Sequence, residues 1–325
     1  CHGPDESTRK RGLRLDLRDG AIAPAKPGRD PAIIPGDAER SLLIERITDH
    51  LDPMPPSGEP LTAAEIETLR RWVDDGAEYA GHWSWEPVGD PTPPVIAPER
   101  QRLIRTDIDR FINGALEKAD LDPSGDATAA RQVRRLSYDL VGLPPDPAIV
   151  EAFEADPSEA HWNRLVERYL ASPGFGERWG RHWLDLVRYA ETCGHEFDYP
   201  IREAWRYRDW VIRALNEDLP YDRFVREQIA GDLLDPRINP ADGTNESVVG
   251  TGFWYFHQAV HAPTDVTQDQ SDRIANQLEV LGQGFLGLTV ACARCHDHKF
   301  DAISTRDYYA LSGYMQSMHQ GYAYQ

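Results

Sequence analysis

The sequence has 325 residues, enough for two domains, and a formal net charge of −19 at pH 7. Nucleic acid and anionic lipid repel such an acidic chain, whereas basic partners are favoured. No apolar run reaches the length of about 18 residues that a membrane span needs, and four scattered cysteines do not form a disulfide framework.

Two amphipathic helices are predicted in the N-terminal part of the chain. Apolar residues recur at helical spacing in 38–48 and again in 62–77. Thr62 and Glu65 have the spacing of a capping box at the start of the second helix. Gly76 is a typical helix stop. This part therefore has the elements of a small helical unit.

The rest of the chain is also dominated by helical spacing. Residues 81–100 hold five prolines and predict a semi-rigid linker. No later segment shows the period of a strand over more than a few residues. The predicted fold is mainly α: a small domain over 1–80, the linker, and a larger helical domain with long ordered loops over 101–325.

The stretch VACARCHDHKF, residues 290–300, carries the strongest chemical signal. A c-type haem is attached through two cysteines three residues apart, and the histidine that follows ligates the iron. One turn of chain must reach both vinyl groups before the next residue turns under the metal. The spacing predicts haem c bound covalently by Cys292 and Cys295, with His296 as an axial ligand.

Two other interpretations of the cysteine pair are a zinc site and a redox-active thiol pair. A structural zinc site needs four ligands, usually with a second pair 12 to 20 residues away, and no other cysteine lies that close. A redox-active thiol pair is typical of a βαβ context, which the helical pattern does not supply. The haem interpretation is favoured over both.

A second motif of the same kind is indicated at the start of the chain. Cys1 and His2 match its last two positions. Met54 lies in a proline-flanked loop before an amphipathic helix, and methionine often takes the far side of a cytochrome c iron. We expect His2 as the proximal and Met54 as the distal ligand. The alternative is a methionine that fills a gap in the core.

The distal ligand of the haem at Cys292 has four histidine candidates. We favour His182 for the haem pocket and as the candidate catalytic residue, because a helix holds a ring more rigidly than a loop does. Trp179 and Trp183, close in sequence, are expected to exclude water around it. The alternative is a hydrogen-bonded core histidine. The full set is His182, His195, His257 and His261.

Arginines gather in one stretch of this acidic chain. Haem propionates are anionic and usually need such partners. Ion pairs with the abundant carboxylates are the equal alternative. The residues are Arg178, Arg181, Arg188, Arg202, Arg206 and Arg208.

The chain resembles large secreted cytochrome c proteins of planctomycete type. The resembling stretches include GLRLDLRDGA, MPPSGEPLTAAEIETLRRWVDDGA, GERWGRHWLDLVRYAET and CARCHDHKFDAISTRDYYAL. The resemblance implies a small cytochrome C domain, a helical domain of unknown function with its own haem motif, and export to the periplasm or beyond. We therefore expect a fragment, with a signal peptide upstream, the first part of the N-terminal motif missing, and a further domain after residue 325.

Three functions are consistent with these features. The favoured one is periplasmic electron transfer through two c-type haems, with a basic redox protein as partner. The first alternative is a haem enzyme of oxidase or peroxidase type with an open second haem, acting in polysaccharide metabolism, as the resemblance weakly implies. The second is a glycan-binding or scaffold module with a structural haem. A nucleic-acid partner is not expected.

Overall fold

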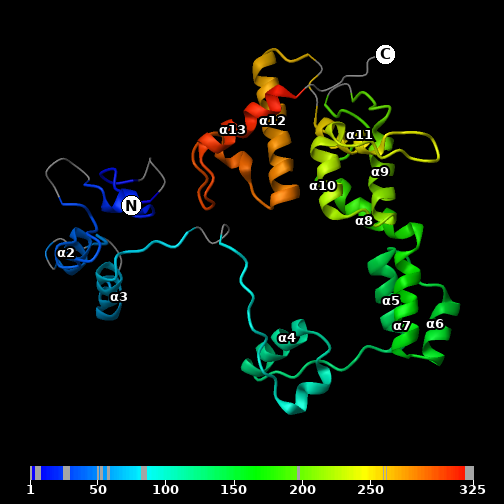
Figure 1. Cartoon of the computed structure of the whole chain (residues 1–325), viewed down its shortest axis with the longest axis horizontal. Coiled ribbons are helices and arrows are strands. Elements are labelled where there is room, and N and C mark those ends of the chain that lie inside the picture. Colours follow the sequence, from blue (N-terminus) through cyan, green and yellow to red (C-terminus); the bar gives the residue numbers. More distant parts are fainter. Residues whose placement is uncertain are drawn as a thin grey trace. The chain divides into compact units, whose positions relative to one another are not determined.

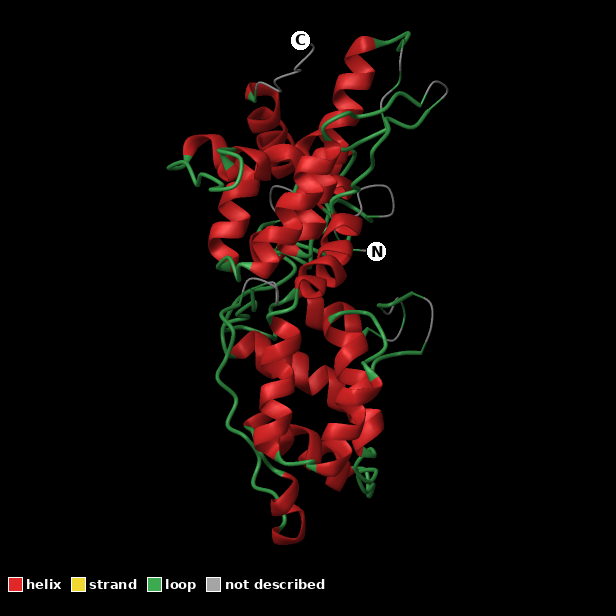
Figure 2. Ribbon diagram, turned by 90° about the vertical axis from the view of Figure 1, so that its right-hand side faces the viewer, coloured by secondary structure: helices red, strands yellow, loops and turns green. Residues whose placement is uncertain are grey.

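The computed structural model describes residues 2–3, 9–24, 30–49, 51, 54–56, 59–81, 86–195, 198–258, 260 and 262–318. These residues form helices joined by loops (Figures 1 and 2). Their β-type pairing is limited to two isolated bridges, Thr192–Pro200 and Ile238–Asn245. The prediction of a mainly α fold is confirmed. Among the helices described, none has the length and apolar character to cross a membrane.

The chain divides into two compact units. The first unit comprises residues 1–88 together with 292–310. The second unit comprises residues 89–291 together with 311–325. The domain boundaries expected from the sequence, at residues 80 and 100, stay a prediction.

The first unit has a small core beneath short helices. This core buries Ile33, which lies in the loop before α2, together with Ile44 of α2 and Val73 of α3. The expected capping box at the start of α3 is confirmed, since Thr62 N–H donates to the Glu65 carboxylate over 2.7 Å and Glu65 N–H donates to Thr62 Oγ1 over 3.3 Å. The helices are α1 (Arg18–Ile22), α2 (Leu42–Thr48) and α3 (Ala63–Asp74).

The second unit contains most of the helices labelled in Figure 1. Several of them begin at a side-chain cap, for example at Ser172, whose hydroxyl accepts the N–H of Gly174. In chain order they are η2 (Pro98–Leu103), α4 (Asp107–Lys118), α5 (Ala129–Leu140), α6 (Pro147–Ala155), α7 (Glu159–Leu170), α8 (Pro173–Leu186), α9 (Ala204–Asn216), α10 (Tyr221–Ala230), η3 (Gly231–Leu233), α11 (Glu246–Val249), η4 (Gly250–Tyr255), α12 (Val266–Leu281) and η5 (Gly282–Leu286). Two elements lie at or across the boundary between the units, η6 (Val290–Arg294) and α13 (Thr305–Ser317).

Close packing of α8 against α9 fixes the core of the second unit. A Cβ atom at Gly176 would lie 2.4 Å from the carbonyl oxygen of Ile212, so the backbones approach closely because this position is glycine. The buried face of α9 presents Tyr207 and Trp210, which stack at 5.7 Å between ring centroids. This packing sets where the C-terminal end of α8 lies.

Two carboxylates are buried beside this core and held by arginines. Glu227 is fully buried. Its carboxylate accepts hydrogen bonds from Arg223 Nε and from Arg237 Nη2, each over 2.9 Å. Glu246 is buried as well and accepts from Arg213 over 2.8 Å. A buried carboxylate needs such partners, because leaving it unpaired costs several kcal/mol.

Candidate haem-attachment sites

The segment before the cysteine pair turns sharply. Helix α12 runs on into the π-helix η5, and Gly287 follows in the left-handed region with φ 66°. A Cβ atom at Gly282 would lie 2.6 Å from the carbonyl oxygen of Leu288, which is closer than these two atoms can approach. Glycine at this position therefore permits the turn that leads the chain into η6.

The cysteine side chains face away from the core. In a 3₁₀-helix, residues three apart lie on the same side. Val290 and Ala293 are buried on one side of η6, and Cys292 is exposed on another. Cys295, in the turn just after the helix, is exposed as well, and both thiols are free. Two thiols three residues apart are thus presented outward, as covalent attachment of a planar group requires.

His296 has a defined ring orientation. Its Nδ1 atom lies 2.8 Å from the carbonyl oxygen of Asp297. A carbonyl oxygen only accepts, so Nδ1 carries the proton and Nε2 keeps its lone pair. Metal-binding histidines usually donate their other ring N–H in this way. The side chain is exposed, and Nε2 is the atom suited to ligate iron.

His298, two residues on, has a different role. It is buried, and its Nδ1 accepts the backbone N–H groups of Phe300 at 3.2 Å and Asp301 at 2.8 Å. The backbone N–H of His298 donates to the carbonyl oxygen of Ile303 over 2.8 Å. These bonds hold the loop after the motif, so His298 positions the segment and leaves His296 as the outward-facing ring.

The start of α13 also holds this loop. Thr305 N–H donates to Asp297 Oδ1 over 2.9 Å. Ser304 caps the helix, since Asp307 N–H donates to Ser304 Oγ over 3.2 Å and Ser304 N–H donates to Asp307 Oδ2 over 2.8 Å. Tyr309 Oη donates to the carbonyl oxygen of Arg294 over 3.3 Å. Asp297 is therefore held at its side chain, and that steadies the residue whose carbonyl orients His296.

His2 is tied to the first unit through its backbone. Its carbonyl oxygen accepts the N–H of Leu15 over 2.8 Å, and the carbonyl of Leu15 accepts the hydroxyl of Tyr79 over 3.0 Å. The His2 Nδ1 atom is buried and has no hydrogen-bond partner among the described residues. Cys1 lies outside the described residues. An unpaired ring nitrogen is consistent with a role in binding a metal or cofactor, and the assignment of His2 as proximal ligand stays a prediction.

Met54 lies where the loop after α2 is tied back to that helix. Its N–H donates to the carbonyl oxygen of Arg46 over 3.0 Å, and its side chain is half-buried. The peptide bond between Met54 and Pro55 is cis. The thioether is thus neither deep in the core nor fully in solvent. Its assignment as distal ligand stays a prediction.

The candidate distal histidines lie in different environments. His182 is exposed on α8 and makes an edge contact with Trp179 at 5.6 Å, itself 43% exposed. Trp183 does not shield it, because its indole N–H points into the core and donates to Gln228 over 3.0 Å. The expected enclosure of His182 by two tryptophans is therefore not seen, and a haem-pocket role for it stays a prediction.

The other candidates are loop residues. His195 is exposed with φ 65°. His257 is half-buried, and its Nδ1 donates to the carbonyl oxygen of Gln258 over 3.0 Å. Burial lowers the pKa of His257, so its ring is neutral at pH 7 and Nε2 keeps a lone pair. His261 lies outside the described residues. Among the described distal candidates, His257 has the ring chemistry best suited to a ligand.

The structure separates the arginines that the sequence grouped. Arg206 pairs with Glu203, and Arg208 pairs with Glu191 over 2.8 Å. Both are surface ion pairs, the alternative that the composition allowed. Arg188 differs, because its guanidinium is largely buried, a distinction that spacing in the sequence could not reveal.

The motif residues fit a covalently bound haem c. Haem c supplies one-electron chemistry, and the protein supplies attachment, an axial ligand and the surrounding charge. Cys292 and Cys295 would hold it and His296 would ligate its iron. Within the described part of the chain, no group of three or more His, Cys, Asp or Glu side chains could hold a metal ion by itself. The zinc interpretation therefore gains no ligand set there.

Two family models match the chain. The model described as planctomycete cytochrome C matches residues 1–58, which contain His2 and Met54. The model described as a protein of unknown function, DUF1549, matches residues 107–320, which contain Cys292–His296. No curated protein and no solved structure matches.

The order of the two matches confirms the architecture implied by the resemblance. The N-terminal match marks the chain as a c-type cytochrome, and this class of protein carries haem c. The other match spans more than half of the residues. The chain therefore belongs to the DUF1549 family, in the form in which a planctomycete cytochrome C domain comes first.

Proposed function

We propose that the chain is an exported two-haem electron-transfer protein, with one haem at His2 and Met54 and the other at Cys292–His296. The observation that carries this proposal is the geometry of the second motif. Two exposed thiols are followed by an imidazole whose Nδ1 is already bonded to a carbonyl, 2.8 Å away. Such an arrangement supports covalent attachment and one fixed axial ligand, which is what a transfer site needs.

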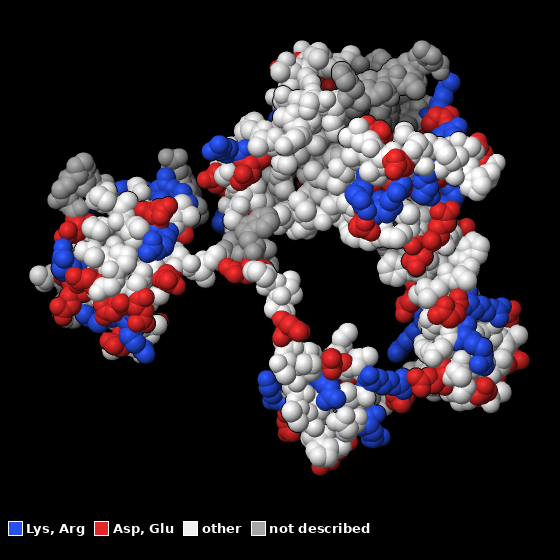
Figure 3. Space-filling model, in the orientation of Figure 1, with Lys and Arg blue, Asp and Glu red and all other residues white. Residues whose placement is uncertain are grey.

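The partner we propose is a basic redox protein. The chain carries a net charge of −19. In the first unit, acidic side chains lie over α2 and α3 with basic side chains between them (Figure 3). Complementary charge raises the rate of encounter between two proteins, and salt screens the effect. The net negative charge therefore favours fast exchange with a basic donor or acceptor.

Stopped-flow kinetics would test this function. The reduced full-length protein is mixed with a small basic redox protein, and in parallel with an acidic one of similar potential. We expect the basic partner to react faster by at least about tenfold at low salt, and the advantage to shrink as ionic strength rises. Equal rates with both partners at every salt concentration would contradict the proposed partner.

Spin state separates this function from the enzyme alternative. A transfer site keeps its iron six-coordinate and low-spin, whereas a catalytic site leaves one position open. Paramagnetic-resonance spectra of the oxidised protein at neutral pH would show the difference. We expect low-spin signals from both haems; a high-spin second haem would favour the oxidase or peroxidase interpretation. Retention on immobilised polysaccharide by a redox-inert form would favour the scaffold interpretation.

A further inference from the structure

Arg188 ends helix α8 in a conformation that favours glycine. Its φ is 59°, and the N–H of Tyr189 donates to the carbonyl oxygen of Leu184 over 2.9 Å, as at a helix end closed by a left-handed residue. A side chain at this position has a conformational cost that glycine avoids. Residues held in such conformations are common where a side chain is needed for binding.

The guanidinium group of Arg188 has one unpaired edge. Nη1 donates to the carbonyl oxygen of Val187 over 3.2 Å. Nε and Nη2 are inaccessible to solvent and have no hydrogen-bond partner in the described part of the chain. These two N–H groups form the fork that binds both oxygens of a carboxylate. Arg188 therefore carries a two-donor edge that no described protein group pairs with.

The charge of Arg188 persists at neutral pH. Burial lowers the pKa of Arg188 to about 10, and the nearby carboxylate of Glu279 opposes this shift. A group with that pKa is protonated at pH 7. A buried charge is costly unless it is paired, so an anion at the free edge would be strongly stabilised.

A second guanidinium lies in the same neighbourhood. His257 has its pKa lowered mainly by burial, and further by the charges of Arg273 and Arg188. His257 is therefore within electrostatic reach of both arginines. Because its Nδ1 donates to Gln258, its neutral ring adds no positive charge and leaves Nε2 as an acceptor. The group combines two cations with a neutral ring inside an acidic protein.

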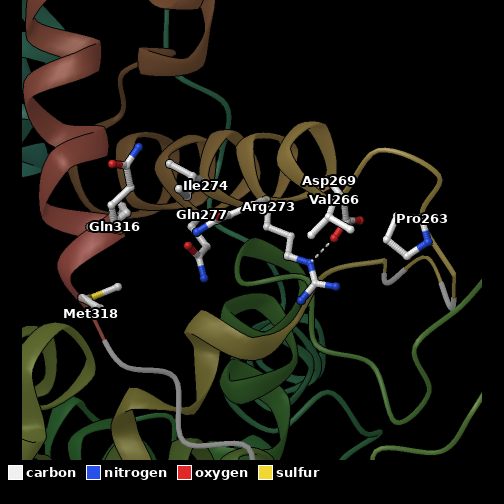
Figure 4. A pocket seen from close by; sticks show the side chains of 10 residues that line it. Pro263, Val266, Asp269, Arg273, Ile274, Gln277, Gln316 and Met318 are labelled. Atoms are coloured by element: carbon white, nitrogen blue, oxygen red, sulfur yellow. Dashed lines mark ion pairs between the residues drawn. The ribbon is translucent and has the colours of Figure 1, made fainter.

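One member of this group, Arg273, lines a cavity of about 450 Å³ within the second unit. Arg273 and Asp269 line it from α12, where Arg273 Nε lies 2.9 Å from Asp269 Oδ2 (Figure 4). Ile274 and Met318 contribute apolar lining. The volume is in the range of sites for small molecules, about 300–1,000 Å³. Arg273 belongs to the cavity lining and also, like Arg188, to the charges that act on His257.

We propose that Arg188 anchors a carboxylate-binding site in the second unit, with Nε and Nη2 donating to the two carboxylate oxygens. The ligand is a monoanion, because the carboxylates of Glu279 and Asp269 would repel a second negative charge. A carboxylate can come from two sources, a free organic acid or a propionate of bound haem. The cavity that Arg273 lines, with Ile274 and Met318 among its lining residues, favours a free acid with an aliphatic body.

Thermal unfolding of the haem-loaded, full-length protein tests the site with butyrate as the probe and butyramide as its neutral counterpart. We expect Tm to rise saturably with butyrate and not with butyramide. Arg188→Gln should abolish the rise, and Arg188→Lys, which keeps the charge without the fork, should weaken binding about tenfold. Arg208→Gln, at a surface arginine paired with Glu191, should respond like the parent.

Two further measurements distinguish the source of the carboxylate and the alternative of a structural arginine. If butyrate has no effect but Arg188→Gln lowers the haem midpoint potential while Arg208→Gln does not, the carboxylate is a propionate. Arg188→Met should raise Tm of the ligand-free protein by about 2–4 °C if the free acid is the ligand, because it removes an unpaired buried charge. No response to butyrate, an unchanged potential and a lower Tm in Arg188→Met together would overturn the proposal.

Discussion

The Nδ1 atom of His296 lies 2.8 Å from the carbonyl oxygen of Asp297, and this contact decides which ring nitrogen faces outward. The same Asp297 accepts the N–H of Thr305 at its side chain over 2.9 Å. The ring is thus oriented by a residue that is itself fixed. In a haem protein this contact would set both the tautomer and the angle of the proximal ligand.

Replacing His296 should remove an axial ligand of the haem iron and leave the two thioether bonds intact. In His296→Ala, Cys292 and Cys295 remain exposed, so we expect haem to stay covalently attached while the low-spin signal of the second haem is lost. Visible absorption and paramagnetic resonance of the purified protein measure this. His161→Ala is the control, because His161 lies on α7 and bonds to the carbonyl of Asp156. Identical spectra for His296→Ala and the parent would rule out His296 as a ligand.

Two glycines of η5 give a matched pair of variants. A Cβ atom at Gly282 would lie 2.6 Å from the Leu288 carbonyl oxygen, whereas a Cβ atom at Gly284 would meet nothing within 4 Å. Gly282→Ala should destabilise the fold by about 1–3 kcal/mol and reduce haem attachment, because the turn into the motif must shift. Gly284→Ala should be neutral or slightly stabilising. Urea unfolding and haem content per protein would show whether the two differ.

The thioether of Met54 can be tested by its optical signature. In the full-length exported protein, Met54→Ala should abolish the near-infrared band that arises from sulfur ligation of ferric haem. Met315→Ala is the control, because Met315 packs against the core of the second unit. If the band persists in Met54→Ala and disappears in another methionine variant, that other methionine is the distal ligand and the assignment to Met54 is wrong.

Because of Glu227, the free energy of unfolding should depend on pH. Burial alone would raise the pKa of Glu227, but hydrogen bonds and charges of Arg237 and Arg223 outweigh it, so the folded-state pKa lies below the usual value. An ordinary glutamate has a pKa of about 4.3. The stabilisation is therefore complete above about pH 4.3 and is lost as the pH falls through the lower, folded-state value.

Glu227→Gln is the corresponding variant. We expect it to lower the free energy of unfolding at pH 7 by about 3 kcal/mol, because it leaves two arginines without their buried partner. The gap to the parent should narrow below pH 4. Glu203→Gln, at an exposed pair with Arg206, should cost about 1 kcal/mol or less. Urea titrations at pH 7 and pH 3 measure both variants, and a gap independent of pH would refute the assignment.

Local features of the fold were largely predictable from the sequence. The capping box of Thr62 and Glu65 and the stop at Gly76 with φ 107° both depend on a few neighbouring residues. The segment expected as a linker over 81–100 already contains the start of the 3₁₀-helix η2, Pro98–Leu103. Such boundaries are set by tertiary contacts, which periodicity does not report.

The candidate site was predictable in its chemistry and less so in its surroundings. The spacing of Cys292, Cys295 and His296 predicts the attachment chemistry by itself. Spacing could not show that Trp183 turns away from His182 into a hydrogen bond with Gln228, because neighbours on one helix can point to opposite sides. Nor could it show that Arg188 is buried without a carboxylate partner, since burial depends on segments far apart in sequence.

The central claim is that Cys292 and Cys295 bind haem covalently. The most direct measurement is pyridine haemochrome quantitation of the full-length exported protein after extraction with acidified acetone, in the parent, in a Cys292→Ser, Cys295→Ser double variant, and in Cys193→Ser as the control. We expect the parent and the control to retain the same haem, and the double variant to retain one haem fewer per chain. If the double variant keeps as much acid-stable haem as the parent, or if the parent releases all of its haem into acetone, the account is wrong.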